Sequence, residues 1–84
     1  METRGDILVT GGAGYIGSVL VPKLLDRGRR VTVLDGFFFG YEPLEPVVGH
    51  EHVSTVEGDI RNRELVDRVL EAGDYDAVIH LAAI

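Results

Sequence analysis

A cluster of four glycines directly after a short apolar run constrains the fold of this chain more than any other feature. The apolar run is Ile7 to Val9, and the cluster lies in the segment Thr10-Gly11-Gly12-Ala13-Gly14-Tyr15-Ile16-Gly17. A β-branched and leucine run before a glycine cluster is typical of a strand that is buried on both faces of a parallel sheet. The sequence therefore predicts a first strand from Asp6 to Thr10, followed by a tight glycine turn.

A helix is expected after the glycine turn. Apolar residues follow at three- and four-residue spacing, which marks one face of a helix, and Gly28 is a stop signal. Pro22 opposes this prediction, because its missing N–H group and its clash with the carbonyl of Ser18 cost about 3 kcal/mol. The apolar spacing continues on both sides of Pro22, so we expect a helix that is bent near Ser18. The apolar positions are Ile16, Val19, Leu20, Leu24 and Leu25.

Three further strands are predicted along the chain. Arg30 to Leu34 ends at Asp35, Val53 to Glu57 ends at Gly58-Asp59, and Ala77 to His80 forms the fourth strand. The resulting order, β-α-β-loop-β-α-β, implies an α/β fold with a parallel sheet and right-handed crossovers. We expect the strand order 3-2-1-4, with helices on both faces of the sheet.

The two remaining connections differ in character. Gly36 to His52 contains many glycines and prolines, so we expect a loop with one helical turn at most, between Glu42 and Val48. Asn62 is the expected N-cap of a second helix, and Gly73 is its stop signal. The apolar positions of that helix are Leu65, Val66, Val69 and Leu70.

The composition fits one small domain and excludes several classes of function. The chain has 84 residues and a formal net charge of −6, without the basic stripe that nucleic-acid binding needs. The absence of cysteine excludes disulfides, zinc-thiolate sites and thiol nucleophiles. The first apolar run is too short for a signal peptide or a membrane span. We therefore expect a cytoplasmic chain that binds neither nucleic acid nor a membrane.

The glycine segment also has the spacing that binds the pyrophosphate of a dinucleotide. Gly12, Gly14 and Gly17 form Gly-x-Gly-x-x-Gly, and Gly11, Gly14 and Gly17 form Gly-x-x-Gly-x-x-Gly. Pyrophosphate needs free N–H groups at a helix N-terminus, without side chains that hold it away. A glycine turn can also have a purely structural role, without binding a ligand. However, Asp35 ends the next strand 18 residues after Gly17, close to the spacing of the acid that binds the adenosine ribose. These features predict binding of NAD rather than NADP, because a carboxylate repels a 2′-phosphate.

The chain resembles the extended short-chain dehydrogenase/reductases, in particular the NAD-dependent sugar-nucleotide epimerases and dehydratases. The resemblance rests on four segments in the order of the family: Thr10 to Gly17, Val33-Leu34-Asp35, Gly58-Asp59-Ile60-Arg61 and His80-Leu81-Ala82-Ala83. It implies a partial Rossmann-type sheet, in which residues 1–84 form the N-terminal part of an NAD-binding domain.

The resemblance also implies which residues contact the cofactor. Gly36 departs from the family pattern, which often has Asn after the ribose acid, so any side-chain contact from this position is lost. The implied contacts are the backbone N–H groups of Tyr15 and Ile16 for the pyrophosphate, Asp59 and Ile60 for the adenine, and Leu81, Ala82 and Ala83 for the path toward the nicotinamide ribose.

The catalytic residues of the family have no counterpart in these 84 residues. The family uses a Tyr-x-x-x-Lys pair, in which the lysine lowers the pKa of the tyrosine. The only lysine is Lys23, and no tyrosine precedes it by four positions. We therefore expect no catalytic and no metal-binding residue in the chain, which looks like the first quarter of such an enzyme. A nucleotide sugar is expected to bind only in a full-length relative. A stand-alone nucleotide-binding module and a non-binding chain that associates with itself remain alternatives.

Several candidate residues also have a purely structural interpretation. Asp59 could cap the turn after its strand instead of binding adenine. His50 and His52 are interpreted as solvated loop residues rather than metal ligands, and His80 as a hydrogen-bonded structural residue. We expect Phe37-Phe38-Phe39 to pack beneath the following segment. The alternative is an apolar wall for the adenine or a partner surface.

The expected topology leaves apolar surface uncovered. Parts of Ile7 to Val9 and of Val31 to Leu34 are expected to face water, because a single helix covers one face of the sheet. An unpaired strand edge beside apolar surface drives association. We therefore expect the chain to associate with itself or to depend on further C-terminal residues. The residues expected at or near the open edge are Val78, Ile79, Leu81 and Ile84.

Overall fold

The fold is described from a computed structural model that covers residues 6–37, 40 and 42–81. These residues form four strands, two α-helices and one short 3-10 helix. The elements in chain order are β1 (Asp6–Thr10), α1 (Tyr15–Asp26), β2 (Val31–Asp35), η1 (Glu42–Leu44), β3 (Val53–Glu57), α2 (Arg63–Ala72) and β4 (Tyr75–His80).

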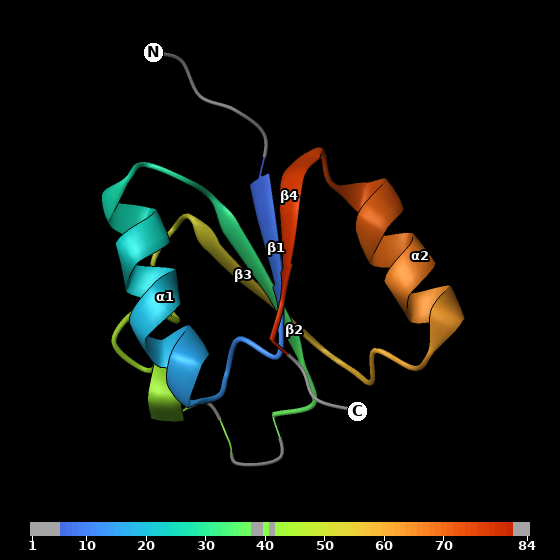
Figure 1. Ribbon diagram of the computed structural model, residues 1–84, viewed down its shortest axis with the longest axis horizontal. Helices are drawn as coiled ribbons and strands as arrows, with labels where there is room; N and C mark the ends of the chain where they lie inside the picture. The colour runs from blue at the N-terminus through green and yellow to red at the C-terminus, as the bar shows by residue number, and fades with distance from the viewer. Residues whose placement is uncertain (1–5, 38–39, 41, 82–84) are drawn as a thin grey trace.

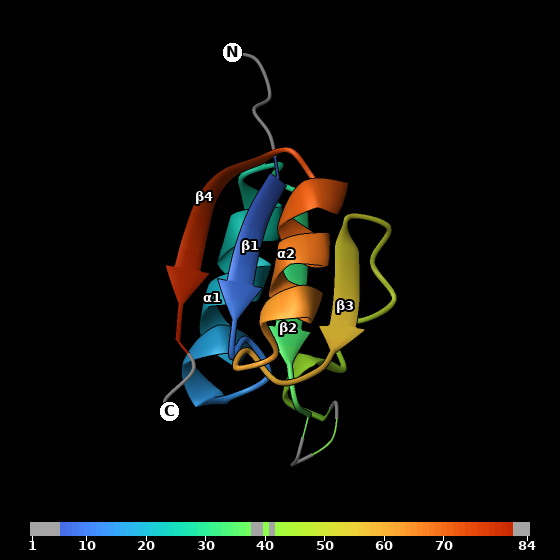
Figure 2. The same cartoon turned by 90° about the vertical axis from the view of Figure 1, so that its right-hand side faces the viewer.

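The four strands form one parallel sheet in the order β3-β2-β1-β4 (Figure 2). Helices α1 and α2 lie on opposite faces of this sheet (Figure 1). Right-handed crossovers explain this arrangement. The connection from β1 to β2 crosses the sheet in one direction, and the connection from β3 to β4 crosses it in the other, so their helices lie on opposite faces. The predicted α/β fold class, strand order and two-sided helix layer are therefore confirmed.

The largest difference from the predicted boundaries is at β4. This strand begins at Tyr75, two residues before the predicted start at Ala77. Tyr75 pairs with Asp6, and the register then shifts so that Ile7 pairs with Ala77, which leaves Asp76 of β4 without a pairing partner in β1. The N–H of Asp6 donates to the carbonyl of Asp74 at 2.8 Å. Strand pairing is made by backbone groups, so it extends beyond the apolar run from which the strand was predicted. The second strand is also displaced, from Arg30–Leu34 to Val31–Asp35.

Helix α1 continues through Pro22 and ends in a Schellman motif. The N–H of Gly28 donates to the carbonyl of Leu25 at 2.9 Å, and the N–H of Arg29 donates to that of Leu24 at 3.1 Å. Gly28 has a φ of +78°, in the left-handed region that favours glycine. The predicted stop at Gly28 is confirmed.

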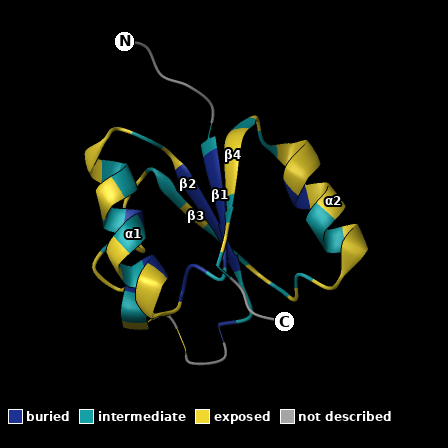
Figure 3. Ribbon diagram, viewed as in Figure 1, coloured by how far each residue is buried: buried dark blue, intermediate teal, exposed yellow. Residues whose placement is uncertain are grey.

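The central strands β1 and β2 are buried on both faces (Figure 3). The expectation that parts of Ile7 to Val9 and Val31 to Leu34 face water is therefore wrong. One hydrophobic cluster lies on the α1 side, where Phe37 and Leu44 of the segment after β2 add to the cover of the helix. The other cluster joins Leu8, Leu34 and Val69, with α2 as its cover. The sequence prediction failed because it counted a single helix as the cover of this face and gave Leu44 no part in that cover.

Strand β4 is one of the two edge strands of the sheet in the described part of the chain, and β3 is the other. Strand β4 pairs with β1 only, and Val78 is 53% exposed. Ile79 and Leu81 are half-buried against the cluster on the α1 side, and Ile84 lies outside the described residues. The predicted open edge is therefore confirmed at Val78.

Neither α1 nor α2 has the length and apolar character that a membrane-spanning helix requires, and this holds for every helix in the described residues.

Candidate functional site

The candidate residues come from segments that are far apart in the sequence but end at one edge of the sheet. Three backbone hydrogen bonds connect the turns at this edge. The N–H of Gly11 donates to the carbonyl of Leu34 at 2.8 Å, and that of Gly58 donates to the carbonyl of Asp35 at 2.9 Å. The N–H of Leu81 donates to the carbonyl of Thr10 at 2.8 Å. The carboxyl ends of parallel strands are where ligands bind in open α/β sheets.

The glycine turn after β1 packs closely against the sheet and against α1. Gly11 has a φ of +75°, which favours glycine at this position. A Cβ on Gly12 would lie 2.8 Å from a methyl group of Val33, and a Cβ on Gly17 would overlap the carbonyl of Gly12. Gly12 and Gly17 are therefore required by packing within the chain. This agrees with the predicted close approach of α1 to the strand at Gly17.

Gly14 differs from these glycines because neither the packing nor the backbone conformation requires glycine at this position. Its φ is −88°, which any residue adopts, and a Cβ would meet only the carbonyl oxygen of Gly11, at 3.7 Å. Gly14 is exposed, so the missing side chain leaves open space at the tip of the turn. A ligand that approaches the backbone closely is one physical reason for glycine at such a position.

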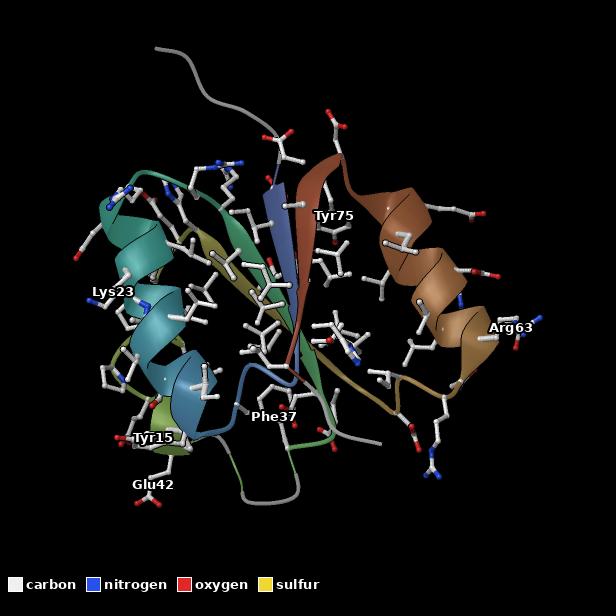
Figure 4. The ribbon with its side chains drawn as sticks, in the orientation of Figure 1. Tyr15, Lys23, Phe37, Glu42, Arg63 and Tyr75 are labelled. Atoms are coloured by element: carbon white, nitrogen blue, oxygen red, sulfur yellow. The ribbon has the colours of Figure 1, made fainter. Side chains whose placement is uncertain are left out.

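The open space lies at the N-terminus of α1. Gly14 is the N-cap residue and contributes no side-chain cap, and the first turn contains no acidic residue. The N–H groups of this turn have no acceptor within the helix, and the helix dipole makes them attractive to an anion. Tyr15 and Ile16 are 85% and 62% exposed. Figure 4 shows the Tyr15 side chain at the N-terminal end of α1.

Asp35 lies at the end of β2, beside the glycine turn. Its Oδ2 accepts from the N–H of Ala13 at 3.0 Å, and its Oδ1 accepts from the N–H of Phe37 at 2.7 Å. A carboxylate offers about four acceptor sites, so two donors leave acceptor capacity for further hydroxyl groups. The structure therefore brings together the predicted ribose acid and the predicted pyrophosphate turn.

Phe37 is buried in the hydrophobic cluster on the α1 side (Figure 4). It is 8% exposed, which agrees with packing rather than with an exposed apolar wall. The other two phenylalanines, Phe38 and Phe39, lie outside the described residues.

Asp59 forms an ion pair with Arg61 in the turn after β3. Nη2 of Arg61 donates to Oδ2 of Asp59 at 2.7 Å, and Nε lies 3.1 Å from both carboxylate oxygens. The backbone N–H of Arg61 donates to Oδ1 at 2.8 Å. The hydrogen bonds from the side chain and backbone of Arg61 lower the pKa of Asp59 from 3.8 to about 2. Asp59 therefore caps its turn, which was the structural interpretation of this residue, and this role is compatible with further contacts.

The remaining predicted cofactor contacts lie around the same edge or outside the described residues. Ile60 is half-buried against the cluster on the α2 side, and Leu81 is half-buried against the cluster on the α1 side. Ala82 and Ala83 lie outside the described residues.

The histidines take structural positions. Nδ1 of His80 lies 2.6 Å from the hydroxyl oxygen of Thr10, so these residues connect the ends of β4 and β1, as predicted for a structural histidine. Nδ1 of His50 accepts from the N–H of His52 at 3.0 Å, and both residues lie in a loop. Among residues 6–37, 40 and 42–81, no group of three or more potential metal ligands is present.

Sequence reasoning gave no role to two groups at this site. The backbone N–H of Ala13 contacts Asp35, which only the packing of the glycine turn on β2 determines. The Arg61 side chain contacts Asp59 across two residues, and the Asp-x-Arg spacing was a usable signal for this pair.

The sequence matches a known protein family over nearly its whole length. The pattern of the family described as "NAD dependent epimerase/dehydratase family" matches residues 7–84. A UDP-glucose 4-epimerase of Halalkalibacterium halodurans is 46% identical over 77 residues, which cover 92% of this chain and 22% of that protein. A UDP-glucose 4-epimerase of Corynebacterium glutamicum is 40% identical, again over 92% of this chain and 22% of that protein.

Solved structures show the same likeness. A dTDP-glucose 4,6-dehydratase of Bacillus anthracis in complex with NAD superposes with a TM-score of 0.88 at 29% identity, over 96% of this chain and 27% of that chain. The Bordetella bronchiseptica enzyme WbmG in complex with NAD superposes with a TM-score of 0.83 at 35% identity, over 98% of this chain and 26% of that chain. The chain thus spans about a quarter of the length of these relatives.

Proposed function

The chain belongs to the NAD dependent epimerase/dehydratase family and corresponds to the N-terminal portion of its members, and on this premise we propose that it binds NAD at the carboxyl edge of its sheet. Two of the structural relatives are complexes with NAD. The observation that carries the proposal is the open N-terminus of α1. Gly14 leaves space there that packing does not demand, and as the N-cap residue it contributes no side-chain hydrogen bond to the helix.

Each part of the cofactor has a matching set of groups in this proposal. The pyrophosphate lies against Gly11, Gly14 and Gly17, where the N–H groups of Tyr15 and Ile16 bind it. Asp35 accepts from the adenosine ribose hydroxyls, and its charge disfavours the 2′-phosphate of NADP. Asp59 and Ile60 hold the adenine edge. The path toward the nicotinamide ribose is formed by Leu81, Ala82 and Ala83.

Catalysis is proposed only for a protein that contains more than these residues. Bound NAD supplies reversible hydride transfer, and the protein positions it against a substrate. Names of the relatives point to nucleotide sugars such as UDP-glucose as the substrate class. Residues 1–84 contain one lysine, Lys23, which is exposed on α1 and has Val19 four positions before it instead of a tyrosine. We assign no catalytic residue to them and regard them as the N-terminal part of an NAD-binding domain.

A second candidate function is self-association, alone or together with nucleotide binding. The observation that favours it is the edge strand β4, where Val78 is exposed beside backbone groups that no other described strand pairs. Such an edge is a template for pairing with another strand.

The test of NAD binding is a titration of the 84-residue chain, followed by the NMR signals of its backbone amides. We expect NAD to shift the signals of residues 11–17 and 35–37, and we expect NADP to bind more weakly. Affinity is expected to be low, because the chain spans about a quarter of its relatives. An absence of shifts at millimolar NAD, or tighter binding of NADP, would contradict the proposal.

A further inference from the structure

A groove of about 400 Å³ lies between α2 and the sheet, at the edge opposite the proposed cofactor site. Asp6 and Tyr75, the first residues of β1 and β4, line this groove together with Ala72 and Gly73 at the C-terminal end of α2. Its volume is in the range of sites that bind small molecules. The groove shares no residue with the groups assigned to NAD.

Two hydroxyl side chains belong to the sheet side of the groove. Thr32 of β2 and Ser54 of β3 are register partners and both line it. Thr32 is only 8% exposed, and its hydroxyl has no hydrogen-bond partner among the described residues. This hydroxyl is not sealed from solvent, so it opens into the groove. Buried polar groups normally have a partner, so a polar ligand is a physical reason for a hydroxyl at this position.

A cation belongs to the same lining. Arg68 of α2 is exposed and forms no ion pair or hydrogen bond within the described part of the chain. A guanidinium and hydroxyl groups are donors that suit a carboxylate. Arg68, Thr32 and Ser54 therefore offer a set of donors that the chain itself does not use.

The opposite charge lies nearer the start of the strands. Asp6 is two residues before Leu8, which pairs in register with Thr32, so Asp6 is one row of side chains away from the two hydroxyls. Its carboxylate lines the same groove and accepts no hydrogen bond from the described residues. Asp6 can therefore accept from a positively charged group of a ligand.

The end of α2 adds acceptors beside Asp6. Gly73 is extended, and α2 lacks the capping hydrogen bonds that close α1 in the described residues. The last carbonyl groups of a helix attract positive charge. A Cβ on Gly73 would lie 2.5 Å from the ring of Tyr75, so this ring packs directly against the helix end. Figure 4 shows the Tyr75 side chain on the side of β4 that faces α2.

The two ends of the groove are about 6–7 Å apart along the fold. Asp6 and the row of Thr32 are separated by two residues of strand, which span about 6.6 Å. Arg68 and Ala72 are separated by four residues of helix, which span about 6 Å. Val69 and Ala72 of α2 supply apolar lining in the same groove.

We propose that this groove binds an ω-amino acid, a small molecule with an apolar chain between an ammonium and a carboxylate group. The carboxylate accepts from Arg68 and from the hydroxyls of Thr32 and Ser54. The ammonium donates to Asp6 and to the carbonyl groups at the end of α2, and the chain of the ligand lies against Val69. The inference does not depend on NAD binding, because the two sites lie at opposite edges of the sheet.

The test is an NMR titration of the 84-residue chain with 6-aminohexanoate. Hexanoate and hexylamine are titrated separately, because each carries one of the two charges. We expect 6-aminohexanoate to shift the amide signals of residues 32, 54 and 68–75 and to bind at least about tenfold more tightly than either comparison compound. The net charge of −6 would by itself favour hexylamine, so preference for the zwitterion reports the groove.

Three variants assign the ends of the ligand. Arg68→Gln is expected to weaken 6-aminohexanoate about tenfold and to leave hexylamine unchanged. Asp6→Asn is expected to weaken 6-aminohexanoate similarly and to leave hexanoate unchanged. Thr32→Val replaces the hydroxyl by a methyl group in a strand that suits valine, and is expected to weaken both carboxylates about threefold or more.

Arg63→Gln is the matched control for Arg68→Gln. Arg63 is also exposed and lies on α2, but it begins the helix and does not line the groove, and Figure 4 shows it at the end of α2 away from Tyr75. It is expected to leave the affinity for 6-aminohexanoate unchanged. Amide spectra establish that each variant is folded.

The outcomes are independent of the proposed function, because NAD binding is followed at residues 11–17 and 35–37. An absence of shifts at high millimolar 6-aminohexanoate would overturn the inference. Hexylamine that binds as tightly as 6-aminohexanoate, or equal losses from Arg68→Gln and Arg63→Gln, would also overturn it and show only a general effect of charge.

Discussion

The carboxylate of Asp35 accepts a hydrogen bond from the backbone N–H of Ala13 at 3.0 Å, across 22 residues of sequence. The acid that is predicted from the sequence to bind ribose therefore contacts the glycine turn directly. Ala13 is buried, so its N–H group has no alternative partner in water. The residue proposed to bind ribose is therefore connected directly to the turn proposed to bind pyrophosphate.

Replacement of Asp35 by alanine is expected to destabilise the chain as well as to abolish NAD binding. The change leaves the buried N–H of Ala13 without its acceptor, at a cost of about 1–3 kcal/mol. Asp35→Asn keeps one carboxamide oxygen as an acceptor and is expected to lose less stability. Urea unfolding monitored by circular dichroism measures both differences. If Asp35→Ala were as stable as the natural chain, the carboxylate would not hold the turn.

The prediction of the elements from sequence succeeded where local signals and burial agree. Ile7 to Val9 is a short apolar run before a glycine cluster, and it is the buried centre of β1. The start of β4 was missed because Tyr75 is half-buried and Asp76 is exposed, so neither residue extends the apolar run from which the strand was predicted. The burial of Leu44 was missed because a loop rich in glycine and proline carries no periodic signal, whereas the packing of that loop on α1 depends on the whole fold.

Contacts within the site were harder to predict than the elements that carry it. The sequence pointed to Gly14 and Asp35, but their relationship depends on how the turn after β1 packs on the end of β2. The N–H of Ala13 carries no sequence signal, because every residue other than proline has one. The pair of Asp59 and Arg61 was easier to predict. An aspartate side chain that accepts from the backbone N–H two residues later forms an Asx-turn, which is a local motif.

Gly14→Ala is expected to separate ligand binding from stability. The φ of −88° suits alanine, and a Cβ would lie 3.7 Å from its nearest neighbour, so stability is expected to change by less than about 1 kcal/mol. NAD affinity is expected to fall at least about tenfold, because the methyl group would occupy the space proposed for the pyrophosphate. The measurement is an NMR titration together with a urea unfolding curve.

Gly17→Ala is the matched control for this experiment. Its Cβ would overlap the carbonyl of Gly12, so a loss of at least about 2 kcal/mol of unfolding free energy is expected. Unchanged NAD binding by Gly14→Ala would show that the open space at the helix N-terminus is not where the pyrophosphate lies.

The Asp59 carboxyl is expected to titrate with a pKa of about 2 in the folded chain, below its ordinary value of 3.8, because the Arg61 side chain and backbone hydrogen bond to the ionised form. A folded-state pKa below the unfolded value means that the pair adds to stability above pH 4. That contribution is lost as the pH falls toward 2. Both side chains are largely exposed, so water screens the interaction and limits its energy.

The measurement is the carbon NMR shift of the Asp59 carboxyl as a function of pH. Arg61→Gln is expected to raise the pKa toward 3.8 and to remove this part of the loss of stability in acid. A pKa near 3.8 in the natural chain would show that the ion pair is not formed in solution.

The 84-residue chain is expected to convert no nucleotide sugar when NAD is present. Lys23 is the only lysine and lies on α1, and the sequence contains no tyrosine four positions before it. No side chain is therefore assigned to proton transfer at a sugar hydroxyl. Incubation with UDP-glucose and NAD, followed by chromatography of the nucleotide sugars and by absorbance of the reduced cofactor, is the measurement. Turnover by homogeneous material of 9.2 kDa would contradict this prediction.

Self-association of the 84-residue chain is expected to depend on the edge strand β4. Val78 is 53% exposed on a strand that pairs only with β1 in the described residues, so another copy can align with the free backbone groups. Light scattering at tens of micromolar is expected to give a mass above the 9.2 kDa of one chain. Val78→Lys is expected to shift the mass toward 9.2 kDa, because a charged side chain on an edge strand disfavours pairing.

Val48→Lys places the same charge at another exposed valine, in the segment after β2, and is expected to leave the association unchanged. A natural chain that is monomeric under these conditions, or an equal effect of both lysine variants, would contradict association through β4.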